Sequence, residues 1–215
     1  MTLSFDRRYR EEGYRLLCGI DEAGRGPLAG PVVAAAVIMP EKGRINNIDD
    51  SKKIKEPQRE LLAARIRERA LSWAVGLASV EEIDRINILQ ATFLAMRRAV
   101  SGLGLRPDYL LVDGRDFPAF VYPGTEGTLS GEAVVKGDAK SYAIACASIL
   151  AKVHRDKLMA EWADAYPQYG FEKHKGYAAA HHIAMLRRHG PCPLHRRKFI
   201  RNFVNDAPGG QGELF

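Results

Sequence analysis

Residues 16–27 have the sequence Leu-Leu-Cys-Gly-Ile-Asp-Glu-Ala-Gly-Arg-Gly-Pro, in which an apolar run is followed at once by two adjacent carboxylates. The apolar run predicts a short strand over residues 16–20. A strand that ends in Asp21 and Glu22 directs negative charge out of a sheet edge, where a divalent cation can be held. The glycines on either side of Arg25 leave the backbone bare for close approach, and a planar guanidinium suits phosphate. This turn therefore predicts a metal on one side and a polyanion on the other.

Length and composition indicate an ordinary globular protein. The chain has 215 residues, enough for one well-cored domain, with 46% hydrophobic and 27% charged residues. No apolar run approaches the roughly 20 residues that span a bilayer, and the charged N-terminus has no signal-peptide core. Cys18 and Cys146 lie in apolar surroundings far apart in the sequence, which favours reduced, buried thiols. We therefore expect a cytoplasmic protein that does not contact membranes.

Positive charge is concentrated toward the C-terminus. The net charge is +6, and residues 152–201 contain eleven Lys or Arg against four acids, together with all six histidines. A basic C-terminal third beside a carboxylate-bearing N-terminal part is what a nuclease would need. A solvated basic face explains the same charge equally well, so charge alone leaves both readings open.

Apolar runs alternate with helical spacing along the chain, which predicts an α/β or α+β domain with helices packed on a mixed sheet. Further strands are expected at residues 31–39, 72–79, 107–112 and 132–135. Helices are expected at residues 56–70, 80–100, 139–165 and 177–189. Residues 41–55 are expected to form a loop, and residues 205–210 a flexible spacer before a short terminal peptide.

Two further aspartates stand where strands or helices change direction. Asp113 ends the strongest strand and precedes Gly114, so it is either a metal ligand at a strand end or a common turn-initiating aspartate. Asp138 precedes the long predicted helix, where it is either an ordinary N-cap or an ionised carboxylate ready to bind a cation. Asp156, beside Arg155 inside that helix, is interpreted as part of an exposed structural ion pair.

Residues 19–32, Gly-Ile-Asp-Glu-Ala-Gly-Arg-Gly-Pro-Leu-Ala-Gly-Pro-Val, resemble the signature of type 2 ribonuclease H, ribonuclease HII. Other segments are similar to the remaining motifs of that family and follow in its order: residues 50–53, 112–114, 136–156, 169–171, 174–177 and 195–197. The resemblance covers residues 18–200. It implies an α/β, ribonuclease H-like mixed sheet flanked by helices, as one catalytic domain over residues 1–204 whose basic, helical C-terminal extension begins near residue 175.

The resemblance also implies a metal site. Four carboxylates would hold two Mg²⁺ or Mn²⁺ ions: Asp21, Glu22, Asp113 and Asp138. A phosphodiester transition state needs both its attacking and its leaving oxygen stabilised, and two cations about 4 Å apart do this. Hard oxygen ligands suit Mg²⁺ or Mn²⁺ rather than zinc, and His181 and His182 are interpreted as surface or phosphate-contacting residues.

Substrate contacts follow from the same resemblance. Gly24, Arg25 and Gly26 would approach the backbone around a ribonucleotide, whose 2′-hydroxyl alone distinguishes RNA from DNA, and Tyr177 would pack at the RNA–DNA junction rather than on the core. Candidate phosphate contacts, with a solvated face as the alternative, are Lys52, Lys53, Lys175, Arg196 and Arg197. The chain departs from the usual family pattern at Ala178 and Ala179, where Gly and Thr are commoner, and at Lys198, where Ser is usual.

The last five residues resemble the short peptide by which many bacterial proteins dock on the replication sliding clamp. Leu214 and Phe215 would fill an apolar pocket while Gln211 hydrogen-bonds beside it, with a disordered tail over residues 205–215 as the alternative.

Together these features predict a monomeric endoribonuclease that hydrolyses the RNA strand of RNA–DNA hybrids and nicks DNA 5′ of embedded ribonucleotides, leaving a 3′-hydroxyl and a 5′-phosphate. Ribonucleotide excision repair and removal of RNA during DNA replication are the expected uses. The alternatives are a two-metal nuclease for all-DNA junctions and a non-catalytic hybrid-binding adapter.

Overall fold

The computed structural model describes residues 4–48 and 54–204. The predicted phosphate contacts Lys52 and Lys53 lie outside the described residues. So do the predicted clamp-binding residues Gln211, Leu214 and Phe215.

A mixed five-stranded sheet with the order β3-β2-β1-β4-β5 forms the centre of the molecule. Its strands are β1 (Leu17–Ala23), β2 (Val32–Ile38), β3 (Ser72–Ala78), β4 (Tyr109–Asp113) and β5 (Gly131–Val134). β1 pairs antiparallel with β2 and β2 with β3, whereas β1 and β4, and β4 and β5, run parallel. The predicted mixed sheet flanked by helices is confirmed.

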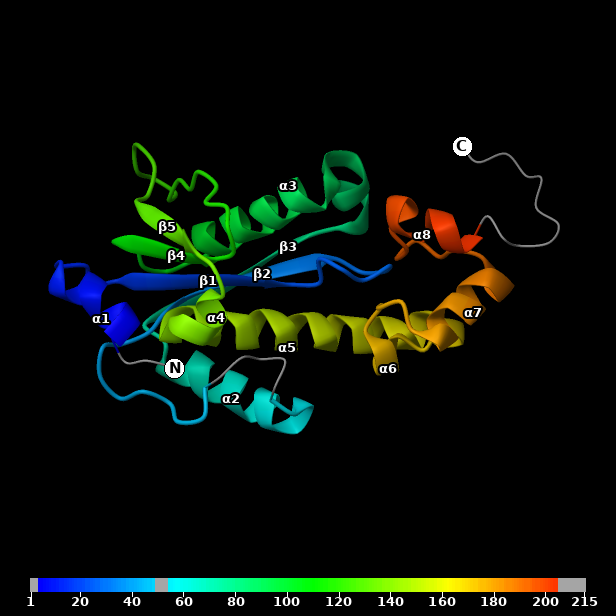
Figure 1. Cartoon of the computed structure of the whole chain (residues 1–215), viewed down its shortest axis with the longest axis horizontal. Coiled ribbons are helices and arrows are strands. Elements are labelled where there is room, and N and C mark those ends of the chain that lie inside the picture. The colour runs from blue at the N-terminus through cyan, green and yellow to red at the C-terminus, as the bar shows by residue number, and fades with distance from the viewer. Residues whose placement is uncertain (1–3, 49–53, 205–215) are drawn as a thin grey trace.

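Helices cover both faces of this sheet (Figure 1). Their bounds are α1 (Ser4–Glu11), α2 (Glu56–Arg69), α3 (Val80–Ser101), α4 (Gly137–Lys140), α5 (Tyr142–Ala165), α6 (Phe171–His174), α7 (Ala180–His189) and α8 (Arg197–Val204), with a 3₁₀ turn at Pro167–Tyr169. α3 lies on one face and α5 with α2 on the other, while α6, α7 and α8 gather near the C-terminal end of α5 (Figure 1). None of the helices in the described part of the chain is long and apolar enough to cross a membrane.

β2 shows why the sheet is buried on both sides. All seven of its residues are buried, and all except Val33 belong to one of two hydrophobic clusters on opposite faces. Val32, Ala34 and Ala36 pack in the α3 cluster, whereas Ala35 and Val37 pack in the cluster of α2 and α5. Alternate residues of a strand point to opposite faces, so a continuous apolar run is what a strand covered on both faces requires.

Two predicted helices are interrupted. The helix expected at residues 139–165 is broken at Ser141, which is extended and caps α5 by accepting a hydrogen bond from the Ile144 amide at 3.3 Å. Inside α3, Asn87 has φ 67° and its side chain accepts from the amides of Leu89 and Gln90, so the helix starts again there. Ser and Asn side chains compete with helical hydrogen bonds, and Asn tolerates a positive φ.

Candidate active site

Asp21 and Asp113 lie at the same edge of the sheet. Ile20 of β1 is in register with Val112 of parallel β4, so the aspartates that follow them come out side by side. Asp21 is only 5% exposed and accepts a hydrogen bond from the Glu22 amide at 2.7 Å. Burial raises the pKa of Asp21 well above its usual range, and the negative charges of Glu22 and Asp113 raise it further. Three of the four predicted carboxylates therefore share one electrostatic environment.

Asp138 reaches this edge through the turn after β5. The amide of its neighbour Gly137 donates to Oδ1 of Asp113 at 2.6 Å, which ties the start of α4 to the end of β4. Asp138 lies in the short α4, and its carboxylate accepts from the amide of Ala139 at 2.9 Å, so of the two interpretations the cap of the long helix is wrong. The long helix takes its cap from Ser141 instead.

These carboxylates suit a divalent cation by their chemistry. Carboxylate oxygens are the hard donors that Mg²⁺ and Mn²⁺ prefer, and a cation would relieve the mutual repulsion that raises the pKa of Asp21. Across residues 4–48 and 54–204, no group of three or more His, Cys, Asp or Glu side chains is arranged so that it could hold a metal ion. By their chemistry the residues that suit the ions are Asp21, Glu22 and Asp113, whose charges act on one another, and Asp138 follows Gly137, whose amide contacts Asp113.

Two buried arginines hold the loop that follows β1. Arg196, 0% exposed, donates to the carbonyl oxygens of Gly24, Arg25, Gly30 and Pro31 at 2.6–3.2 Å. Arg155, 1% exposed, donates to Ala29, Pro31 and Lys175 at 2.9–3.0 Å. Burial lowers the pKa of both guanidinium groups, that of Arg196 to about 9. The expected phosphate contact of Arg196 is thus not what the structure shows, because its guanidinium is committed to backbone carbonyls.

The same contacts orient the Gly24–Gly26 backbone. Gly24 has φ +95°, and a Cβ there would lie 2.0 Å from Nε of Arg155, so only glycine fits. No cis peptide bond occurs among the described residues, and in a trans peptide the C=O and N–H point in opposite directions. Since the carbonyls of Gly24 and Arg25 point to Arg196, the amides of Arg25 and Gly26 point the other way, and both residues are exposed.

Tyr177 lies next to this loop. It is 47% exposed, and its ring comes within 3.9 Å of where a Cβ on Gly26 would be. The Arg25 guanidinium is 3.5 Å from a carboxylate oxygen of Glu22. The structure therefore brings Arg25, Gly26 and Tyr177 together beside Glu22. The spacing predicts Tyr177 at the start of a helix, but α7 begins only at Ala180. Tyr177 does not pack in the core either.

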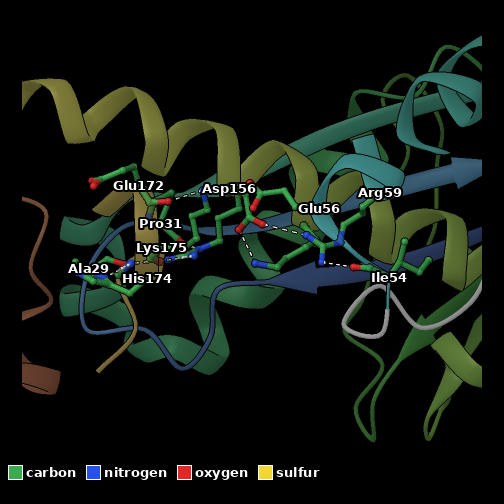
Figure 2. A network of polar contacts seen from close by, with 12 residues as sticks. Ala29, Pro31, Ile54, Glu56, Arg59, Asp156, Glu172, His174 and Lys175 are labelled. Carbon is green, nitrogen blue, oxygen red and sulfur yellow. Dashed lines mark hydrogen bonds and ion pairs between the residues drawn. The ribbon is translucent and has the colours of Figure 1, made fainter. Parts of the chain in front are cut away.

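A polar network beside the loop holds α2 against α5 (Figure 2). Asp156 is 6% exposed and pairs with Arg59 at 3.3 Å and Lys152 at 2.5 Å. The predicted exposed ion pair of Asp156 with Arg155 is therefore wrong. Asp156 is buried against Arg59 of α2, and Arg155 is buried against the backbone of Ala29, Pro31 and Lys175. Lys175 pairs with Glu56 at 3.2 Å and donates to the Glu172 carbonyl at 2.8 Å.

The remaining predicted contacts divide between surface and interior. Arg197 is exposed, and its amide donates to Asp84 at 3.1 Å. His181 is exposed, as expected, but His182 is 0% exposed and hydrogen-bonds to His195, so the surface role predicted for it is wrong. Sequence reasoning missed the loop-holding role of Arg155, although an arginine within a largely apolar helix was a signal for it.

Known proteins resemble this chain over nearly its whole length. The sequence profile of a family described as Ribonuclease HII matches residues 18–202. A protein named Ribonuclease HII from Pelodictyon phaeoclathratiforme is 52% identical over 198 residues, covering 90% of this chain and 93% of that one. The crystal structure of the ribonuclease H2 from Pyrococcus horikoshii OT3 is 27% identical with a TM-score of 0.71, covering 90% of this chain and 99% of that one.

A PCNA:RNase HII complex from Archaeoglobus fulgidus gives the same TM-score of 0.71 at 27% identity, covering 86% of this chain and 95% of the matched chain. The resemblance seen in the sequence is thereby confirmed. The chain belongs to the ribonuclease HII family of metal-dependent endoribonucleases, which degrade the RNA of RNA–DNA hybrids.

Proposed function

We propose that this protein nicks duplex DNA on the 5′ side of an embedded ribonucleotide as well as hydrolysing the RNA strand of hybrids, leaving a 3′-hydroxyl and a 5′-phosphate. The observation that carries this proposal is the juxtaposition of two features. The carboxylate edge of Asp21 and Asp113 adjoins an exposed loop whose amides face outward, next to the half-exposed ring of Tyr177.

Asp21, Glu22, Asp113 and Asp138 would hold two Mg²⁺ or Mn²⁺ ions, which would make hydroxide accessible near neutral pH and would stabilise the attacking and leaving oxygens. The protein's own contribution is to fix the ligands. Ser148 of α5 hydrogen-bonds to Asp21, and the Gly137 amide fixes Asp113 at 2.6 Å. Because these partners set the carboxylate orientation before substrate arrives, little reorganisation is needed during the reaction.

Ribonucleotide choice is assigned to the Gly24–Gly26 loop and Tyr177. The outward amides of Arg25 and Gly26 are donors that a 2′-hydroxyl oxygen can accept from, and a deoxyribose leaves them unpaired. The ring of Tyr177 offers a flat surface on which a sugar can pack. An active site that tests one hydroxyl next to the cleaved phosphate suits a single embedded ribonucleotide as well as a hybrid.

Arg197 and Arg25 present exposed positive charge for the phosphate backbone. Lys175, whose side chain is 13% exposed and engaged with Glu56, would have to exchange that partner for a phosphate. Lys52 and Lys53 remain proposed phosphate contacts from the sequence resemblance alone. Contacts of this kind add affinity without sequence choice.

We also propose that residues 211–215 dock on the sliding clamp and so bring a cytoplasmic, monomeric enzyme to newly made DNA, for ribonucleotide excision repair and replication. The Archaeoglobus fulgidus relative is described in a complex with PCNA, which supports the idea. Deleting residues 211–215 should abolish binding to purified clamp while leaving the rate of nicking in solution unchanged. Undiminished clamp binding by the truncated protein would refute this.

The central test uses a DNA duplex that carries one ribonucleotide, incubated with and without Mg²⁺ or Mn²⁺. We expect one metal-dependent nick 5′ of the ribonucleotide, and a loss of at least about a thousandfold in Asp113→Asn because a neutral amide is a poor cation ligand. Equal cutting of the matched all-DNA duplex would favour a junction nuclease. Tight hybrid binding with no cutting would favour an adapter.

A further inference from the structure

The carbonyl oxygen of Tyr177 ends a chain of hydrogen bonds that passes through two buried histidines. His182 Nδ1 lies 2.7 Å from that oxygen, and His182 Nε2 lies 3.0 Å from His195 Nε2. On its other side, His195 Nδ1 lies 3.0 Å from the Cys192 amide and 3.2 Å from the Cys192 sulfur. His182 is 0% and His195 3% exposed, so no water competes for these nitrogens.

Donor and acceptor roles along this chain are fixed by its two ends. The Cys192 amide can only donate, so His195 Nδ1 accepts and the His195 proton is on Nε2. That proton is donated to Nε2 of His182, whose own proton is therefore on Nδ1 and is donated to the Tyr177 carbonyl, which can only accept. Each link is satisfied when both rings are neutral. Burial lowers the pKa of His182, and that of His195 to about 4, which keeps both neutral near pH 7.

The backbone of Tyr177 is held by short-range hydrogen bonds, to which His182 adds a contact from the buried side: the Tyr177 amide donates to the His174 carbonyl at 2.9 Å, and the Tyr177 carbonyl also accepts from the Ala179 amide at 2.8 Å. Tyr177 is 47% exposed, so packing constrains its ring on one side only, where the Arg155 guanidinium lies 6.0 Å from the ring centroid. Ala179, the N-cap of α7, has no side-chain oxygen with which to fix the start of the helix. Lys175 and Gly176, just before Tyr177, both have positive φ, 51° and 84°. The backbone of Tyr177 thus lies between an irregular turn and an uncapped helix.

Other aromatic rings hold His182 in place. The His174 ring stacks on it at 4.4 Å with an interplanar angle of 10°, and the Phe171 ring meets it edge-on at 5.5 Å. His174 is itself fixed by its bond to the Tyr169 carbonyl at 2.7 Å. The donor to Tyr177 is therefore rigid, as a positioning group must be.

We propose that His182, oriented by His195, is a positioning residue that fixes the Tyr177 backbone and so holds its ring where it packs on the substrate sugar. This inference rests on the proposed function, since it assigns the histidine pair to the preference for a ribonucleotide over DNA. Neither histidine touches the substrate; both act through Tyr177.

The test uses two variants that differ in which nitrogen they replace. His182→Asn places its amide near the Nδ1 position and can still donate to Tyr177, whereas His182→Gln reaches toward the Nε2 position and loses that bond. We expect His182→Gln to lower kcat/KM on a duplex with one ribonucleotide by about tenfold, as loss of a buried hydrogen bond would. His182→Asn should retain most of the activity, and Glu68→Gln, a substitution at an exposed position of α2 with no role in the site, should match the wild type.

A double-mutant cycle with Tyr177→Ala separates positioning from general damage. If His182 acts through Tyr177, adding His182→Gln to Tyr177→Ala changes kcat/KM by less than about twofold. The same tenfold loss in both backgrounds would overturn the inference. So would equal activities of the Asn and Gln variants.

Nuclear magnetic resonance of the wild-type protein measures the histidine tautomers directly, so this test does not depend on whether a variant folds. Long-range proton–nitrogen spectra should show His182 protonated on Nδ1 and His195 on Nε2; the opposite tautomers would overturn the chain of bonds. A wild-type protein that does not nick at a ribonucleotide would refute the proposed function and this role with it. Nicking together with an additive cycle would refute only the role.

Discussion

Replacing Arg196 by lysine tests whether the substrate loop is held from inside. The guanidinium donates to four carbonyl oxygens at 2.6–3.2 Å and is 0% exposed. A lysine ammonium is a compact point charge that cannot span carbonyls from residues 24 to 31, so we take it to keep two of these bonds. At about 1.5–2 kcal/mol for each lost bond to a charged group, Arg196→Lys should destabilise the fold by about 3–4 kcal/mol.

The assay is equilibrium unfolding in urea, with Arg197→Lys as the matched control. Arg197 is the adjacent, exposed arginine, so its conservative substitution should change the free energy of unfolding by less than about 0.5 kcal/mol. For a chain of this size, the loss expected in Arg196→Lys also lowers the melting temperature by about 10 °C. If Arg196→Lys unfolds within about 1 kcal/mol of the wild type, the buried hydrogen bonds do not hold the loop and the reasoning fails.

Three further outcomes follow from other parts of the fold. Gly19→Ala should unfold the protein or destabilise it by several kcal/mol, since its Cβ would lie 2.1 Å from the Ala143 backbone; a soluble variant with a wild-type melting curve contradicts this. The hydrogen bond from Arg98 lowers the pKa of Glu82 to about 2. The pair therefore contributes fully to the free energy of unfolding above pH 4.5, and this contribution is lost as the pH falls through 2. Allowing for the exposure of Arg98, Glu82→Gln should cost about 1 kcal/mol in urea unfolding at pH 7, with the difference narrowing in acid; a pH-independent difference argues against the pair. Burial lowers the pKa of His195 from about 6.5 in the unfolded chain to about 4, so its contribution to stability is complete above pH 6.5 and is lost as the pH falls toward 4. Between these pH values the His195→Gln variant should take up about one proton fewer on unfolding than the wild type does. An unchanged slope of unfolding free energy against pH would refute this.

The sequence predicted the fold best where an apolar run is bounded by charged residues, because such a run indicates a buried strand and shows where it ends. An apolar run ending in Asp21-Glu22 predicted a strand with its carboxylates at a sheet edge, and β1 and β4 place Asp21 and Asp113 there together. That these aspartates adjoin one another came from the family resemblance, because spacing along a chain does not specify which strands pair.

Charged residues were the main source of error. The sequence predicts a phosphate contact for Arg196 and an exposed ion pair for Asp156, yet both residues are buried with their polar atoms satisfied. The carbonyls around Arg196 come from a loop some 170 residues earlier, and no local pattern encodes that pairing. The helix breaks at Ser141 and Asn87 depend on single side-chain hydrogen bonds, which apolar periodicity does not detect.

Anomalous diffraction from crystals soaked in Mn²⁺ tests the metal site most directly. We predict manganese peaks at the sheet edge, with oxygen atoms of Asp21, Glu22, Asp113 and Asp138 at about 2.1–2.3 Å, and loss of at least one peak in Asp113→Asn. Manganese bound elsewhere, or one of these four carboxylates directed away from the ions with substrate present, would contradict the account.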